Sequence, residues 1–485
     1  MRYNIVSNII GSNLRYISII MLAPVIFSIL YREPVHSFAF ICASVISVIL
    51  GFLFTLPKAS EKDIDSIKKP EALCGVFFSW VFFAIICAVP YLFYGINITN
   101  SLFESVSGIT TTGATILQDF SLYPKTLFFY RAMTQWLGGM GIVVLFIAVL
   151  PKFAVAGRQM FSAESPGPVE EKVTPRIRHT ASWLWGIYLG LTIVQIIALK
   201  LCGMDFYNAL CNTLATVSTG GLSPNPESIM GYHNQKAVIV IGVFMFLSGA
   251  NFILQYRVFI QRKWSAFIKS EEFLTYLGIT VFISLSIALF LQAKQEGSFL
   301  NNLIDGAFQT ISLITTTGFA SCDFIKWGAD AKIMLFAAMF ASGCAASTAG
   351  GIKIIRWIFL FKYLKREVAK IIHPSAVYPI RLENRPVPDD TGSQMIAFCI
   401  FYFFIFTLSS FVVALLEKNP AIAISGSITT LGNIGPGLSA KIGPMASFDP
   451  LCSVTKWIFI FNMLIGRLEL IPFLALLHKD MWTSK

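Results

Sequence analysis

Four short turns rich in threonine, serine and glycine recur along the chain, and their oxygens could replace the water around a bare cation. They comprise Thr110, Thr111, Thr112 and Gly113; Val217, Ser218, Thr219 and Gly220; Thr315, Thr316, Thr317 and Gly318; and Asn433, Ile434 and Gly435. The four glycines lie 107, 98 and 117 residues apart, so one module recurs four times. Four such turns about one axis would direct four sets of carbonyls at one hole, and the sequence therefore predicts an ion pore within a single polypeptide.

The residue types of the turns suit this role. Glycine can adopt positive φ, so that successive carbonyls point to one side of the chain instead of alternating. Hydroxyl groups either brace the turn or add an oxygen ligand. Val217 and Ile434 replace hydroxyl residues, which predicts moderate selectivity. The alternative for a single turn is that small residues merely allow close helix packing, but four matching turns favour the pore.

A short apolar segment precedes each turn, at 100–112, 205–219, 302–317 and 419–433. As a helix of about 20 Å, such a segment enters a hydrocarbon core of about 30 Å without leaving on the far side. Polar residues begin each segment, as helix N-termini prefer. The C-terminal, negative ends of the helix dipoles then point at the turns and favour a cation there.

The composition places these segments in a membrane. Hydrophobic residues make up 55% of the chain and charged residues 13%, whereas about a quarter of the residues of a soluble protein are charged. We predict an all-α integral membrane protein with ten spans, the first retained as a span and not cleaved as a signal peptide. The expected spans are 14–31, 37–57, 73–95, 124–150, 182–202, 234–256, 271–293, 331–361, 394–416 and 451–478.

Spans and turns together predict the organisation of the chain. Residues 1–69 form a two-helix segment without a turn of this kind. Four parallel modules follow, each a span, a short helix, a glycine turn and a second span, around one pore. Their expected limits are 70–180, 181–269, 270–392 and 393–485.

The net charge of +11 is concentrated in the connecting segments 58–69, 152–178, 257–269 and 353–385, which hold 21 of the 37 basic residues. The positive-inside rule places these segments and both termini in the cytoplasm. Because the basic residues are gathered in these segments, orientation in the membrane explains the positive charge better than binding to nucleic acid does. Nine cysteines without C-x-x-C spacing predict neither a zinc site nor a redox dithiol, and no cofactor is expected.

Small polar residues interrupt the second span of the third module. The interruption comprises Gly343, Cys344, Ala345, Ala346, Ser347, Thr348, Ala349, Gly350 and Gly351. The spacing of a phosphate-binding P-loop is absent. A broken helix lining the pore is the main interpretation, and tight packing through small residues is the alternative.

Arg467 lies sixteen residues into the final span. A lipid-facing arginine at this depth costs about 2.5–3.5 kcal/mol, so Arg467 should face protein or water. A structural pairing with a carboxylate or with carbonyls is an equal alternative to a role in the pore.

Four motifs resemble those of TrkH-like members of the Trk/Ktr/HKT superfamily. They are residues 103–115, residues 431–438, the segment Gln135-Trp136-Leu137-Gly138-Gly139-Met140-Gly141, and Gly466-Arg467-Leu468-Glu469. The resemblance covers essentially the whole chain, including the two extra N-terminal helices.

The resemblance implies a potassium-selective, channel-like subunit of the bacterial inner membrane, homodimeric and controlled by a TrkA-like cytoplasmic nucleotide-binding ring. Potassium is then the substrate at the four turns. It also implies that residues 343–351 form an intramembrane gating loop, and that Arg467 projects into the pore below the filter.

Two other functions are weighed against the pore. A secondary potassium symporter coupled to H⁺ or Na⁺ usually has inverted or two-fold repeats and ionisable residues at a midplane site. A membrane enzyme needs a catalytic constellation, but the five histidines lie outside or at the ends of the expected spans. The symporter remains the alternative, and no enzymatic activity is expected.

Overall fold

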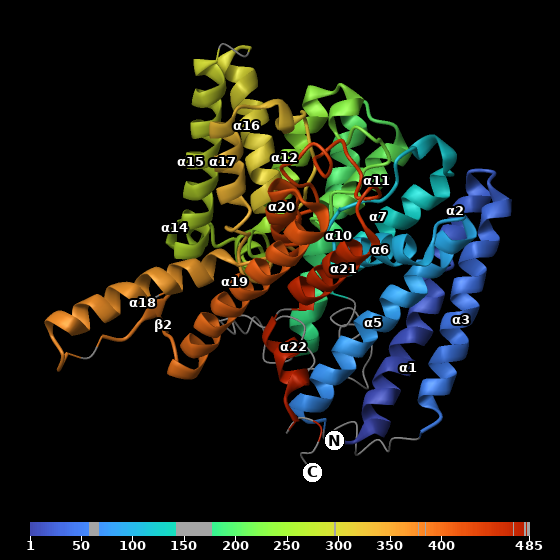
Figure 1. Ribbon diagram of the computed structural model, residues 1–485, viewed down its shortest axis with the longest axis horizontal. Coiled ribbons are helices and arrows are strands. Elements are labelled where there is room, and N and C mark those ends of the chain that lie inside the picture. The colour runs from blue at the N-terminus through green and yellow to red at the C-terminus, as the bar shows by residue number, and fades with distance from the viewer. Residues whose placement is uncertain are drawn as a thin grey trace.

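The computed structural model describes residues 1–57, 67–141, 177–294, 297–376, 378–383, 385–468, 470–479 and 482. These residues are predominantly α-helical (Figure 1), as expected for an all-α membrane protein. The one described sheet is a hairpin of β1 (Arg381–Leu382) and β2 (Arg385–Pro386).

The N-terminal segment consists of α1 (Tyr3–Ile20), α2 (Ala23–Leu30), η1 (Pro34–His36) and α3 (Ser37–Thr55). The first span begins earlier than expected, at Tyr3 instead of residue 14, because polar side chains on α1 find partners inside the protein. The Asn13 amide, for example, donates to the Ser79 hydroxyl at 3.0 Å. Close approach of α1 and α3 is possible because Gly11 and Gly51 face each other where they cross.

Each of the four following units begins with a long helix, namely α5 (Lys69–Phe93), α10 (Ile177–Leu201), α15 (Glu271–Ala293) and α19 (Asp389–Glu417). A short helix follows in each unit: α6 (Ile98–Ile109), α11 (Phe206–Val217), α16 (Phe299–Ile314) and α20 (Pro420–Leu431). Short 3₁₀ turns lie in three of the connections to the second helices, η2 (Phe120–Leu122), η4 (Met230–Tyr232) and η6 (Phe324–Lys326).

The second helices are shorter than the expected spans. They are α7 (Lys125–Gly139), α12 (Gln235–Gly249), α17 (Ala329–Ala338) and α21 (Ser453–Leu468). After them come α13 (Phe252–Gln255), η5 (a π-helix, Tyr256–Ile260), α14 (Ser265–Lys269), α18 (Ile354–Ile372) and α22 (Leu470–Leu477).

The sequence predicted a break in the second helix of the third unit alone, but the second helix of the second unit is also broken. In the second unit the chain turns by 102° between Gln235–Gly249 and Phe252–Ile260. Among the described residues, six helices are long and apolar enough to cross a membrane, or seven with this bent pair. The expectation of a continuous span was wrong for 234–256, which bends, whereas the predicted interruption of 331–361 lies between α17 and α18. In the expected span 451–478, α21 and α22 are separated by residue 469, which lies outside the described residues. Of the expected span 124–150, residues 142–150 lie outside the described residues, as does most of the basic segment 152–178.

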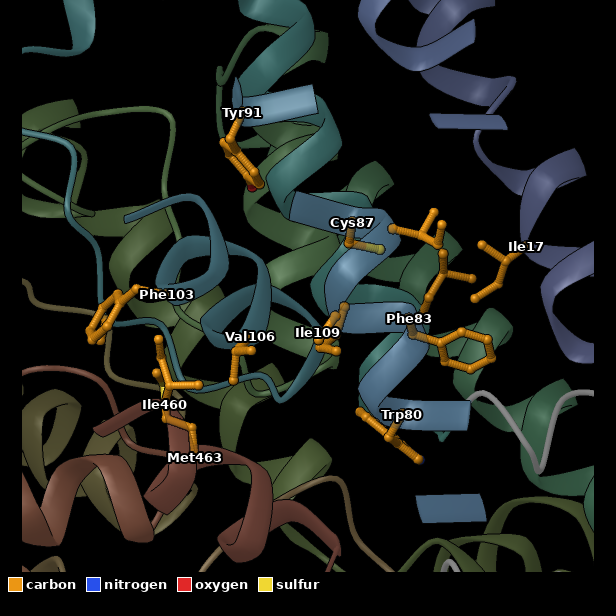
Figure 2. Packing of buried hydrophobic residues seen from close by; sticks show 14 of the residues in the cluster. Ile17, Trp80, Phe83, Cys87, Tyr91, Phe103, Val106, Ile109, Ile460 and Met463 are labelled. Atoms are coloured by element: carbon orange, nitrogen blue, oxygen red, sulfur yellow. The ribbon is translucent and has the colours of Figure 1, made fainter. Parts of the chain in front are cut away.

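The short helices lie inside the helical assembly, between the long helices (Figure 1). Nine of the twelve residues of α6 are buried, polar ones included, so this helix is enclosed by protein and not by lipid. Figure 2 shows its packing, with Phe103, Val106 and Ile109 of α6 between α5 (Trp80, Phe83, Cys87) and α21 (Ile460, Met463).

Candidate functional site

The four short helices end in the same backbone conformation. The residue after each C-cap is left-handed: Thr111, Thr219, Thr316 and Asn433 have φ between 54° and 57°. The next N–H donates five residues back, from 112 to 107, 220 to 215, 317 to 312 and 434 to 429, at 2.8–2.9 Å. This is the Schellman motif that terminates many helices. Positive φ at a β-branched threonine is strained and typical of functional sites, and it occurs here three times.

The shared conformation corrects the register of the second turn. The glycines with positive φ two residues after the left-handed residue are Gly113, Gly221, Gly318 and Gly435. Gly221, and not Gly220, is thus equivalent to the other three glycines. Val217 is the last residue of α11 and precedes the turn, so it replaces no hydroxyl there. Two adjacent glycines in this turn made the one-residue shift invisible in the sequence.

The four turns contact one another in a closed ring. A Cβ atom on Gly113 would meet the carbonyl oxygen of Gly220, and one on Gly221 would meet that of Thr317. A Cβ on Gly318 would likewise meet the carbonyl oxygen of Ile434, and one on Gly435 that of Thr112. Each glycine therefore packs against the equivalent carbonyl of the next turn, and the fourth turn closes on the first.

Most hydroxyls of the turns brace the backbone. Thr110 Oγ1 donates to the Val106 carbonyl at 2.6 Å, and Thr315 Oγ1 donates to the Ile311 carbonyl at 2.7 Å. The Asn433 amide donates to Thr112 Oγ1 at 3.0 Å and so joins the fourth turn to the first. Because these side chains are engaged with protein, the backbone carbonyls are the groups of the ring best suited to an ion.

Polar N-caps orient the short helices toward the ring. Asn97, Asp205, Ser298 and Asn419 each accept a backbone N–H of the first turn of their helix. Asp205 and Asn419 are the first residues of the expected segments 205–219 and 419–433. The caps of α6 and α16 instead lie three and four residues before the expected starts at 100 and 302. The capped, positive ends point away from the ring, and the negative C-terminal ends converge on it.

An open cavity adjoins the ring on one side. Gly113, Gly221, Gly318 and Gly435 all line it, together with residues that follow the first, second and fourth turns, such as Thr115, Ser223 and Pro436. The four glycines thus share one open space.

The predicted gating segment 343–351 lies against the ends of the short helices. Gly350 N–H donates to Thr316 Oγ1 at 2.8 Å, which ties the segment directly to the third turn. Thr348 Oγ1 lies 3.3 Å from the Val217 carbonyl and 3.1 Å from the Ser248 carbonyl. A Cβ on Gly350 would meet the Gly432 carbonyl at 2.5 Å. The segment therefore contacts the second, third and fourth units at once.

The remaining residues of the segment are held from the side. Cys344 N–H donates to the Gly249 carbonyl at 2.8 Å, and Phe252 N–H donates to the Ala346 carbonyl at 3.1 Å. Both contacts are made with the break in the second unit. Gly351 has a φ of +60° and allows the chain to turn into α18. Ala349, Ser347 and Gly343 complete the segment between these contacts.

Arg467 is paired with carbonyls, one of the two arrangements expected for it. Its Nη1 donates to the Thr348 carbonyl at 2.8 Å, and its Nη2 donates to the carbonyls of Gly138 and Gly139 at 2.6 Å each. The arginine thus connects the fourth unit with the end of α7 and with segment 343–351. Glu469, two residues later, lies outside the described residues.

Buried polar side chains that support the ring or segment 343–351 were given no role from the sequence. Gln135 Nε2 donates to the Gly220 carbonyl at 2.6 Å. Glu104 on α6 pairs with Arg131 on α7. Glu272 Oε1 accepts the N–H of Ala345 at 2.6 Å. The Glu104–Arg131 pair could have been proposed from the sequence, because charged residues inside apolar helices require partners, as for Arg467.

Comparison with known proteins was made by sequence and by structure. A family model described as a cation transport protein, TrkH, matches residues 36–295 and 296–484. The Trk system potassium uptake protein TrkH of Escherichia coli K12 is 34% identical, over 99% of this chain and 100% of its own. TrkH of Vibrio parahaemolyticus is also 34% identical, over the full length of both chains, and TrkG of Escherichia coli K12 is 31% identical over 99% of both.

A solved structure agrees with these relatives. The crystal structure of the potassium transporter TrkH from Vibrio parahaemolyticus superposes with a TM-score of 0.88 at 30% identity, over 99% of this chain and 100% of that one. The chain therefore belongs to the TrkH family of cation transport proteins, within the Trk/Ktr/HKT superfamily.

Proposed function

We propose that this protein takes up potassium through a channel-like pore whose selectivity filter is the ring of the four turns. The observation that carries the proposal is the ring itself, in which each filter glycine packs against the equivalent carbonyl of the next turn. The names of the relatives, Trk system potassium uptake proteins, agree with potassium as the substrate.

Conduction follows from the backbone of the turns. Carbonyls held in a ring replace the hydration shell of potassium, and the C-terminal ends of four helix dipoles favour a positive charge at the same place. Irregular backbone at membrane depth is tolerated where it is buried in protein or lines water, and the open cavity shared by the four glycines would supply such a space. In this arrangement the four units are parallel modules about one pore, preceded by two additional helices.

The segment 343–351 and Arg467 together form the proposed gate. The segment contacts the second, third and fourth units at the C-terminal ends of their short helices, where an ion leaving the filter would meet it. Arg467 holds this segment through the Thr348 carbonyl and adds a positive charge that opposes a cation. Opening therefore requires the segment to leave Thr316 and Arg467.

Control of the gate would come from the cytoplasmic side. We place both termini and the basic connecting segments there by the positive-inside rule, in the bacterial inner membrane. A homodimer and a TrkA-like nucleotide-binding ring are the proposed assembly. Lys365 and Arg366 lie on α18, which begins three residues after the gating segment, and they are the proposed docking residues through which such a ring would act on it.

The test is a flux assay with purified protein in liposomes, using potassium or sodium gradients with and without the cytoplasmic partner. We expect potassium to move down its gradient without another solute. A strict requirement for a proton or sodium gradient would instead support the alternative, an ion-coupled symporter. No potassium movement under any of these conditions would overturn the proposed function.

A further inference from the structure

A buried ion pair lies directly behind the first filter turn. Arg131 Nε donates to Glu104 Oε1 at 2.6 Å, and the Nη2 of the same guanidinium lies 2.5 Å from that oxygen. The two side chains are only 1% and 0% exposed. Charged groups at this depth are costly unless they are paired and hydrogen-bonded, so their arrangement is specific.

Both charges also bind the chain that follows Gly113. Glu104 Oε2 accepts the N–H of Ile116 at 3.0 Å and the hydroxyl of Thr115 at 3.1 Å. Arg131 Nη2 donates to the same hydroxyl at 2.8 Å. These hydrogen bonds therefore hold residues 115 and 116, two and three positions after the filter glycine Gly113, against α6 and α7. Arg131 also lines the cavity shared by the four glycines.

The opposite side of this segment is fastened to the fourth unit. The Thr115 carbonyl accepts the N–H of Phe448 at 2.9 Å. Since Gly435 packs against the carbonyl of Thr112, the first and fourth turns share one boundary in the ring. A displacement of residue 115 would consequently move both turns.

The positions equivalent to Glu104 and Arg131 in the other three units carry no such pair. Counted from the filter glycine, the residues equivalent to Glu104 are Asn212, Gln309 and Gly426, and none carries a charge. Counted from the start of the second helix, the residues equivalent to Arg131 are Ile241, Leu335 and Phe459, all buried and apolar. The pair is thus an addition to the repeated fold, restricted to one quarter of the ring.

We propose that Glu104 and Arg131 are positioning residues that hold the first filter segment and thereby set the discrimination between potassium and smaller cations. The inference rests on the proposed function, because it assigns a role within the same filter. The selectivity of a filter depends on the separation of its carbonyls or on their number and stiffness. Releasing the segment that follows Gly113 would change the separation and the stiffness of the carbonyls in the first turn. A sodium ion gains most from carbonyls that can close around it.

The test compares purified variants in liposomes by the potassium-to-sodium permeability ratio, measured as a reversal potential, and by the melting temperature. E104L/R131M replaces the pair with apolar side chains of similar size, a change that often preserves folding. We expect the ratio to fall by about 10- to 100-fold, as for groups that orient the ligands of a metal ion. E104Q retains an oxygen for the Ile116 N–H and should lose less.

A control is the ion pair between Arg2 of the N-terminal segment and Glu71 of α5, whose charged atoms lie 2.8 Å apart. Neither residue lines the cavity shared by the filter glycines. E71Q should lower the melting temperature and leave the permeability ratio unchanged. If E104L/R131M does not fold, R131K provides the measurement, since it keeps a charge but cannot bridge Glu104 and Thr115 in the same fork geometry. The inference is overturned, and the proposed function is not, if the wild type is selective and the permeability ratio is unchanged in each folded variant of the Glu104–Arg131 pair. Absence of wild-type potassium flux instead overturns the proposed function.

Discussion

Replacing Arg467 with alanine removes a contact that the structure assigns to the proposed gate. The side chain donates one hydrogen bond to Thr348 in segment 343–351 and two to the carbonyls of Gly138 and Gly139. Only the bond to Thr348 must break when the segment moves. A hydrogen bond to a charged group contributes about 1.5–3 kcal/mol. Losing it shifts the opening equilibrium by about 10- to 150-fold, because each 1.4 kcal/mol is a factor of ten.

The charge of Arg467 acts separately from its hydrogen bonds. A fixed positive charge opposes a cation most strongly when salt is dilute, since the screening length is about 30 Å at 0.01 M and about 10 Å at 0.1 M. Arg467→Ala should therefore raise potassium flux at both concentrations and raise it more at 0.01 M. Arg467→Lys keeps the charge but loses the planar fork, so it should raise flux by a factor less dependent on salt.

The assay is single-channel recording or liposome potassium flux at the two salt concentrations, with a melting curve for each variant. A variant with segment 343–351 shortened serves as the comparison, because a steric barrier should fall equally at either concentration. The reasoning is refuted if well-folded Arg467→Ala and the shortened variant both conduct no faster than the wild type. The barrier would then lie elsewhere along the pore.

Three further predictions concern the filter, the gate and the partner. Gly221→Ala should abolish potassium selectivity, since the φ of Gly221 is +75° and a Cβ would meet the Thr317 carbonyl. Gly220→Ala should retain more of the selectivity, because its Cβ would meet the side chain of Gln135. Reversal potentials measure the selectivity of both variants, and equal selectivity would contradict this assignment. Glu272→Ala should increase basal flux because the Ala345 N–H loses its acceptor, and flux without a partner measures this; unchanged flux contradicts it. Replacing Lys365 and Arg366 with glutamine should weaken binding of a TrkA-like ring in a salt titration, and equal affinity would mean that the basic residues only orient the chain.

Much of the fold could be predicted from the sequence because hydropathy and helix length are local properties. The short helix before each turn, the two additional N-terminal helices and the broken third unit all follow from such signals. The bend in the second unit was not predicted, although the small and polar residues Ser248, Gly249, Ala250 and Asn251 interrupt the apolar run at the break. Asn251 caps the new helix, and segment 343–351 donates to the Gly249 carbonyl and accepts the Phe252 N–H. The local pattern marks where the helix can end, whereas the contacts that hold the bend come from a distant segment.

The filter shows the same division between local and distant causes. Four turns of threonine, serine and glycine could be found by composition, but their register could not, because residues 220 and 221 are both glycine. Gly221 has a positive φ two residues after Thr219, the left-handed residue of the Schellman motif, and the carbonyl of Thr317 leaves no space for a side chain on it. The adjoining Gly220 serves a different purpose, since its missing side chain makes room for Gln135. Two neighbouring glycines are thus required for two different reasons, and only the closed ring distinguishes the residue that shapes the filter from the one that accommodates its support.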